Sequence, residues 1–223
     1  MRKLCLLIIL ILIGLLAPNP IRFVTMLEVP QTAYVYYMPF VAGYSAMANT
    51  GAITPATVSD VGGGSLPTAW VDPNNSKVED GSLATYALPT GGGRTGKLRF
   101  SDFGFAITGT VVGVVVEVKS KNSAPLHDSN TYAQLVKAGT PGGTDSFVFM
   151  TPRGTLTWFT LGTSTDMWGN TLLFSDINNS GFGIDVWTET LPGAASSTSS
   201  IDSVRVTVYF TPRPSSQGFI IAP

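Results

Sequence analysis

Hydrophobic and polar residues alternate along two long stretches in the second half of the chain. From Val111 to Ser120, one face collects valines and the other face collects Gly113, Glu117 and Lys119; the valines are Val112, Val114, Val116 and Val118. From Ile201 to Thr211 the inward set is Val204, Val206, Val208 and Phe210, and Arg205, Thr207 and Tyr209 point outward. A period of two residues predicts half-buried β-strands at both places.

Shorter segments with β character lie between these stretches, separated by turn residues. The expected strands are Leu83–Leu88, Leu98–Ile107, Thr131–Ala138, Ser146–Met150, Thr155–Gly162 and Phe182–Thr188. Clusters such as Gly91-Gly92-Gly93 and Pro192-Gly193 separate them. No stretch after residue 45 has a good helical period, so the sequence predicts an all-β protein with one antiparallel β-sandwich, jelly-roll-like, over residues 66–212.

Residues outside the predicted sandwich form a hydrophobic head, a linker and a tail. Arg2 and Lys3 precede an apolar run from Leu4 to Leu16, which is short for a membrane span. Residues 1–45 are therefore expected to be an anchor or assembly segment: a signal or membrane anchor through residues 4–16, or a retained segment buried in an assembly. Residues 46–65 read as a glycine-rich linker, and residues 213–223 as a C-terminal tail.

Composition narrows the function classes. Only 12% of the 223 residues are charged, whereas glycine (24) and proline (15) are plentiful, as is common in extracellular and particle-forming β-proteins. The net charge is −1, so nothing favours nucleic-acid binding. With one cysteine and one histidine in the chain, multi-thiolate and multi-histidine metal sites are excluded, and no cofactor is expected.

Two segments imitate phosphate-binding or metal-binding motifs, and each lacks a required part. Gly91–Lys97 resembles a phosphate-binding loop, but Leu98 replaces the hydroxyl residue, so a glycine-rich hairpin turn is expected instead. The run from Asp176 to Gly181, with Asn178 and Ser180, resembles half a calcium loop, but Trp187 stands at the twelfth position.

Catalytic side chains find no better support. His127-Asp128 with Ser123 and Ser129 lies within one loop, where a triad geometry is rare. Nothing sets the separation of the carboxylate pairs that a glycosidase would need, Asp185 with Glu189 or Glu117 with Asp202. We therefore expect a protein without catalytic residues or a metal site.

The tryptophans Trp70, Trp158, Trp168 and Trp187 are the most informative large side chains. They are expected either in the core or a subunit contact, or on a face where they stack on a ligand. Trp187 shares its strand face with Asp185, opposite Ile184 and Val186, so it is a candidate for exposure. Trp70, Trp168 and Trp187 are the predicted ligand or subunit contacts.

Aromatic and apolar residues flanking the sandwich predict a homo-oligomer. The candidate contacts are Tyr34, Tyr36, Tyr37, Phe40, Phe219, Ile220 and Ile221. The bland alternative is that both flanking segments fold back on their own sandwich.

Several short motifs resemble those of β-sandwich structural proteins of bacterial viruses. They are Trp70-Val71-Asp72-Pro73-Asn74-Asn75, Phe103-Gly104-Phe105, Trp168-Gly169, Asp176–Gly183 and the closing strand Asp202–Tyr209. This resemblance implies a virion component of the capsid, fibre or tail, which attaches to a host and has no catalytic residues. Its partners would be further copies of itself, other virion proteins and a host-surface glycan. The alternative is a secreted or membrane-anchored cell-surface β-sandwich that binds glycans.

Overall fold

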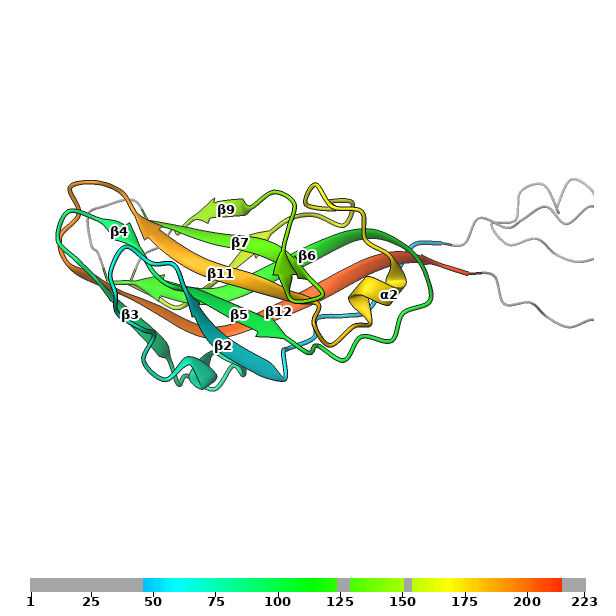
Figure 1. Ribbon diagram of the computed structural model, residues 1–223, viewed down its shortest axis with the longest axis horizontal. Helices are drawn as coiled ribbons and strands as arrows, with labels where there is room; N and C mark the ends of the chain where they lie inside the picture. The colour runs from blue at the N-terminus through cyan, green and yellow to red at the C-terminus, as the bar shows by residue number, and fades with distance from the viewer. Residues whose placement is uncertain (1–45, 124–128, 151–153, 214–223) are drawn as a thin grey trace, which may run out of the picture. The chain divides into compact units, whose positions relative to one another are not determined.

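The computed structural model describes residues 46–123, 129–150 and 154–213, and this part of the chain is almost entirely β-structure (Figure 1). Its strands form two antiparallel sheets that pack face to face, which confirms the predicted β-sandwich. Helical segments are short: a 3-10 turn, η1 (Pro73–Ser76), and one helical turn, α2 (Phe174–Ile177). Among the described residues, no helix has the length and apolarity needed to cross a bilayer.

Sheet A is built around two long antiparallel strands. These are β6 (Gly109–Asn122) and β12 (Ser197–Pro212). Strand β10 (Thr157–Leu161) pairs with the free side of β6. On the free side of β12, β1 (Ala48–Asn49) and β3 (Ala84–Leu88) pair with opposite ends of that strand.

Sheet B has four main strands side by side, and shorter strands pair with parts of two of them. The order is β2 (Thr57–Gly62), β5 (Lys97–Ser101), β11 (Gly183–Thr190) and β7 (Ser129–Lys137). Strand β4 (Gly93–Arg94) pairs with β11 beyond the end of β5. At the far edge, β8 (Thr140–Pro141) and β9 (Ser146–Phe149) pair with different parts of β7.

The chain passes repeatedly from one sheet to the other. Spatial orders of β3–β12–β6–β10 in sheet A and β5–β11–β7–β9 in sheet B follow from the pairings. These are the two four-stranded sheets of a jelly roll. The eight strands in these two orders overlap the eight predicted from the sequence, with ends that differ by up to four residues. The exception is the predicted strand Leu98–Ile107, which ends at Ser101.

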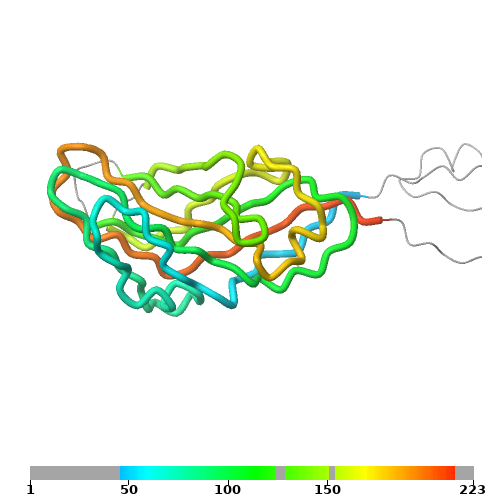
Figure 2. The backbone as a smooth tube through the Cα atoms, in the orientation of Figure 1, coloured from blue at the N-terminus to red at the C-terminus, as the bar shows by residue number. Residues whose placement is uncertain are grey.

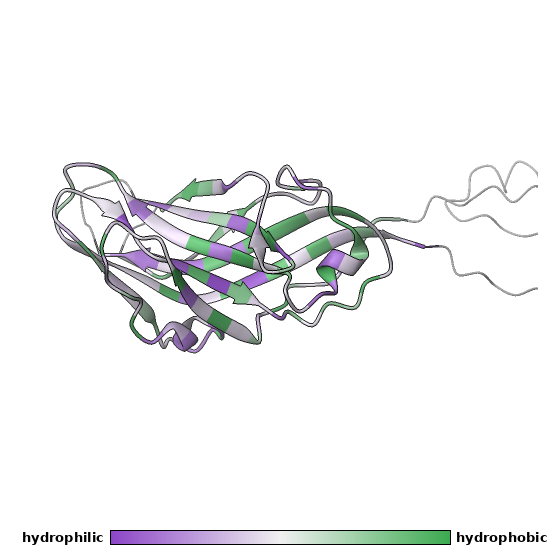
Figure 3. Ribbon diagram, viewed as in Figure 1, coloured by the Kyte–Doolittle hydropathy of each residue, from purple (hydrophilic) through white to green (hydrophobic). Residues whose placement is uncertain are grey.

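The space between the sheets is filled by the inward residues of the alternating strands, and Figure 3 shows that alternation along the ribbons. The fully buried positions include Leu98, Phe100, Val114, Val116, Val118, Leu135, Ile184, Val186, Val204 and Val206. Burying one such side chain stabilises a fold by about 1.5–3 kcal/mol, so this set is the main source of stability.

One predicted face is wrong because of a β-bulge. Tyr209 pairs with Gly113, but Phe210 pairs with Val111, so Val112 is an extra residue on β6. Val111 is therefore buried and Val112 only half-buried, the reverse of the strict alternation. A prediction from alternation assumes an unbroken period of two residues, so it misassigns the faces where a bulge inserts a residue.

Residues 46–65, predicted to be a linker, supply two strands. Strand β1 pairs with the end of β12, and β2 forms the edge of sheet B, where Val58 packs against the core. Asp60 accepts hydrogen bonds from the backbone of Gly62 and Trp70 (2.8 Å each). The segment reads as a linker because an edge strand needs few apolar residues, but the sandwich begins near Ala48.

The two ends of the described chain lie side by side at one end of the sandwich (Figure 2). There β1 pairs with the last residues of β12, Ala48 opposite Phe210. At the other end, the β3–β4 turn contacts the β11–β12 loop, where the Gly91 amide donates to Ala194 (2.7 Å). The described termini therefore cover neither the outer face of sheet B nor the opposite end of the sandwich, which we call the loop end.

Candidate functional site

Two of the three tryptophans predicted as contacts are core residues. Trp70 is 5% exposed; its indole N–H donates to the Gly96 carbonyl (2.7 Å) and its ring packs against Tyr86. Trp168 is 1% exposed, and its indole donates to Val114 (2.8 Å). Neither ring has an accessible face, so both stabilise the sandwich. Trp158 lies under the Arg205 guanidinium, 4.1 Å from the ring centroid.

The third, Trp187, lies on the outer face of sheet B in a row of aromatic side chains. Strand register places it opposite Tyr132, and Tyr132 opposite Phe147. The rings of Trp187 and Tyr132 are stacked (5.2 Å between centroids, 7° between planes), and Phe147 lies 5.3 Å beyond Tyr132. Phe149 meets Phe147 edge-on at 5.7 Å. We call Trp187, Tyr132, Phe147 and Phe149 the aromatic row.

The accessible side chains of the aromatic row are the two phenylalanines on β9, and Trp187 is almost fully buried. Phe147 and Phe149 are 53% and 59% exposed, whereas Trp187 is 4% exposed because neighbouring strands cover it. Both phenylalanines point away from the core from an edge strand. Exposure of two adjacent large rings is unfavourable in water and is typical of a binding surface.

Hydrogen-bonding groups flank the aromatic row on both sides. The Lys97 ammonium lies 4.2 Å from the Trp187 ring centroid and donates to the Gln134 side chain (3.1 Å). Asn130, opposite Phe149 and Glu189 in the register, donates weakly to the Tyr132 hydroxyl (3.5 Å). Its side-chain oxygen is buried and has no hydrogen-bond partner among the described atoms.

Three of the four carboxylates considered as glycosidase pairs, Asp185, Glu117 and Asp202, are held by cations. Both oxygens of Asp185 accept from the Arg99 guanidinium (2.8 and 2.9 Å), and Asp185 is 1% exposed. The hydrogen bonds to Asp185 raise the pKa of the Arg99 guanidinium, although burial opposes the shift. On sheet A, Arg205 grips Glu117 in the same two-point manner, and Lys119 pairs with Asp202 (3.0 Å). These three carboxylates therefore act as structural anions.

Oxygens of the calcium-like loop are occupied by local contacts. Asp176 accepts from the Leu173 amide (2.9 Å) and pairs with Lys137 (2.9 Å). The Asn178 side chain bonds both the amide and the carbonyl of Ile107 (2.9 Å each). Within the described ranges there is no group of three histidine, cysteine or acidic side chains that could hold a metal ion.

Asp176 makes the stability of the sandwich depend on pH in the acid range, because its pKa is lowered in the folded protein. Burial alone would raise the pKa of its carboxyl, but the Leu173 amide and Lys137 outweigh it and lower the pKa below 3.8. The stabilisation is therefore complete above pH 3.8 and lost as the pH falls through the folded-state value. We expect Asp176→Ala to lower the free energy of unfolding by about 1 kcal/mol at pH 6, as for a lost helix cap. In urea titrations the difference from wild type should shrink below pH 3.8; a constant difference down to pH 2.5 would contradict this assignment.

The glycine-rich segment that imitates a phosphate-binding loop crosses between the sheets. It joins β3 of sheet A to β4 of sheet B, so it is not a hairpin turn. Gly92 has φ +90°, and a side-chain carbon there would come within 2.4 Å of the Leu191 carbonyl. Glycine is thus required by the close approach of the β11–β12 loop.

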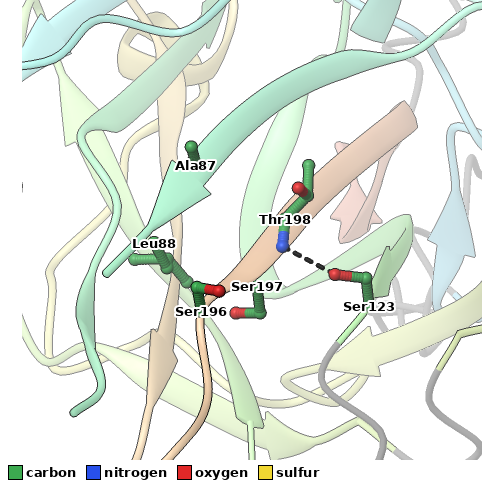
Figure 4. A pocket seen from close by; sticks show the side chains of 6 residues that line it. All are labelled: Ala87, Leu88, Ser123, Ser196, Ser197 and Thr198. Atoms are coloured by element: carbon green, nitrogen blue, oxygen red, sulfur yellow. Dashed lines mark hydrogen bonds between the residues drawn. The ribbon is translucent and has the colours of Figure 1, made fainter. Parts of the chain in front are cut away.

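A small pocket of about 280 Å³ opens at the loop end (Figure 4). Its lining residues are Ala87, Leu88, Ser123, Ser196, Ser197 and Thr198. The Ser123 hydroxyl accepts from the Thr198 amide (2.7 Å), and the buried Ser197 hydroxyl has no partner among the described atoms. The lining carries neither an aromatic ring nor a charge, so it offers fewer recognition groups than the aromatic row.

Several residues singled out in the sequence lie outside the described residues. These are residues 4–16, His127, and the oligomer candidates Tyr34, Tyr36, Tyr37, Phe40, Phe219, Ile220 and Ile221. The membrane and flanking-segment predictions therefore stay predictions.

Comparison with known proteins finds solved structures with low structural similarity to this chain. No family model and no curated protein matches the chain. TmCBM61, solved with β-1,4-galactotriose, is 11% identical with a TM-score of 0.34, over 73% of this chain and 88% of its own. A structure of promiscuous carbohydrate-binding modules of the β-sandwich superfamily is 11% identical (TM-score 0.33; 71% of this chain, 54% of its own). A protein described as a glycoside hydrolase from Bacteroides vulgatus is 12% identical (TM-score 0.31; 69% and 96%). At these scores the likeness does not bear on function, and the site is interpreted from its own side chains.

Proposed function

We propose that the sandwich is a non-catalytic carbohydrate-binding domain, with the aromatic row as its site. The observation that carries the proposal is the exposure of Phe147 and Phe149 beside hydrogen-bonding groups on one sheet face. Sugar rings present C–H faces that pack on aromatic rings and hydroxyls that bond polar side chains. An apolar platform with a few placed polar groups is the general form of such a site.

Arrangement of the aromatic row suits an elongated ligand. Its members stand on β11, β7 and β9, with Lys97 on β5, so it crosses four strands. Neighbouring strands lie about 4.8 Å apart, which gives a path of roughly 15 Å across the sheet. Gln134 on one side and Glu189 on the other are half-buried and can bond hydroxyls along it. An oligosaccharide crossing the strands fits this layout better than a compact ligand, and such a ligand implies an extracellular or cell-surface protein.

The exposed phenylalanines also favour a second candidate, an assembly surface. An apolar edge strand is a natural contact for another subunit. Under this proposal the chain is a virion structural protein, as its resemblance to phage sandwich proteins implies, and Phe147 and Phe149 pack against a neighbouring copy or another virion protein.

A glycan panel and light scattering separate the two candidates. Full-length protein would be probed on immobilised plant, bacterial and animal glycans, and its mass measured by size-exclusion chromatography with light scattering. The carbohydrate proposal expects specific glycan binding that Phe147→Ser with Phe149→Ser weakens about tenfold or more. An oligomer that the same pair dissociates, with no glycan bound by wild type, would instead support assembly.

A further inference from the structure

We propose that the glycan bound by the aromatic row is acidic, and that Lys97 binds its carboxylate or sulfate group. This inference rests on the proposed carbohydrate function and adds the substrate class. It is carried by the position of one ammonium group at the end of the aromatic row.

Lys97 is held at this position from two directions. It begins β5, and its ammonium lies 4.2 Å from the Trp187 ring centroid and 3.1 Å from the Gln134 side-chain oxygen. An ammonium has three N–H donors, so one remains for a ligand after the ring and the amide are satisfied. Two contacts position the charge before a ligand arrives.

No described carboxylate forms an ion pair with Lys97. Three acidic residues lie near it in the sheet register. Asp185 is committed to Arg99 and Asp60 to the backbone of Gly62 and Trp70, and half-buried Glu189, two residues beyond Trp187 on β11, makes no ion pair with Lys97. By contrast, the outward cations Lys119 and Arg205 of sheet A are each held by a carboxylate. A cation that is positioned but not neutralised favours an anionic partner.

The surroundings of Lys97 strengthen that preference. Its side chain covers Trp187, so part of its hydration is already replaced by the ring. Charge interactions beside such partly buried surface are stronger than in bulk water. A sugar that contacts Phe147 and Tyr132 and continues toward β5 would bring its acidic substituent to Lys97.

The test uses full-length protein and pairs of glycans that differ in charge. Oligogalacturonate is compared with its methyl ester, and a sulfated galactan oligosaccharide with its desulfated form, alongside the acidic and neutral members of the panel. We expect the bound glycans to be acidic and the neutralised form to bind at least tenfold more weakly, as for loss of a charged hydrogen bond. Comparing the oligogalacturonate pair with the galactan pair shows whether the protein binds a carboxylate or a sulfate group.

Variants assign the effect to one side chain. Lys97→Met keeps the apolar stem over Trp187 and should lower affinity for the acidic glycan about tenfold, whereas Lys97→Arg should restore most of it. Lys121→Met, on sheet A, should change nothing, and melting curves check that each variant is folded. If every bound glycan is neutral, or Lys97→Met binds acidic glycans as wild type does, the acidic specificity is wrong while carbohydrate binding stands. If no glycan binds at all, the proposed function itself fails.

Discussion

Replacing Arg99 with methionine should lower the free energy of unfolding by about 3–5 kcal/mol, the cost of breaking a buried ion pair from one side. Arg99 gives two hydrogen bonds to Asp185, which is 1% exposed, and a third to the Gly139 carbonyl (2.6 Å). Methionine fills part of the space but leaves a buried carboxylate without a partner. Urea denaturation at pH 7, followed by tryptophan fluorescence, measures the change.

Arg205 provides the matched control. It grips Glu117 with the same two-point geometry (2.8 Å each), but these side chains are 33% and 21% exposed. Water can solvate Glu117 once the arginine is gone, so Arg205→Met should cost about 1 kcal/mol or less. Equal losses at the two positions would show that burial of Asp185 is not the controlling factor.

Replacing Phe147 and Phe149 together with alanine should lower glycan affinity about tenfold or more, with little loss of stability. Each ring contributes about 0.5–1.5 kcal/mol to an aromatic contact, and every 1.4 kcal/mol is a factor of ten in affinity. Since both side chains are more than half exposed, their removal opens no core cavity. Isothermal titration with the best ligand from the glycan panel measures the loss, and a thermal melt checks folding.

Val71→Ala is the control for removing an exposed apolar side chain elsewhere. Val71 is 59% exposed and bridges to Thr85 beside β3, away from the aromatic row. Its variant should bind like wild type. An unchanged affinity in the phenylalanine variant would move the site away from β9.

The long alternating strands are the part of this fold that can be predicted from the sequence. In β12, inward Val204, Val206 and Val208 alternate with outward Arg205 and Thr207 as expected, because each residue reports its own face. The bulge at Val112 and the edge strand β2 cannot be predicted from alternation in the same way. An inserted residue breaks the period, and an edge strand has too few buried side chains to show one.

The site itself depends on register between strands distant in sequence. The face of Trp187 follows from its neighbours Ile184 and Val186, but its burial comes from Lys97 on β5 and Tyr132 on β7. Phe147 and Phe149 lie on a four-residue strand, and only pairing with β7 shows that they face outward. Their shared parity is the one signal that sequence could offer.

Mapping the contact surface by NMR tests the central claim most directly. The isotope-labelled protein would be titrated with the tightest glycan from the panel, and backbone amide shifts followed residue by residue. The account predicts that the largest changes fall on Asn130–Gln134, Ser146–Phe149 and the amides around Lys97 and Trp187. Shifts confined to the outer face of sheet A or to the loop-end pocket around Ser197, with the aromatic row unaffected, would contradict it.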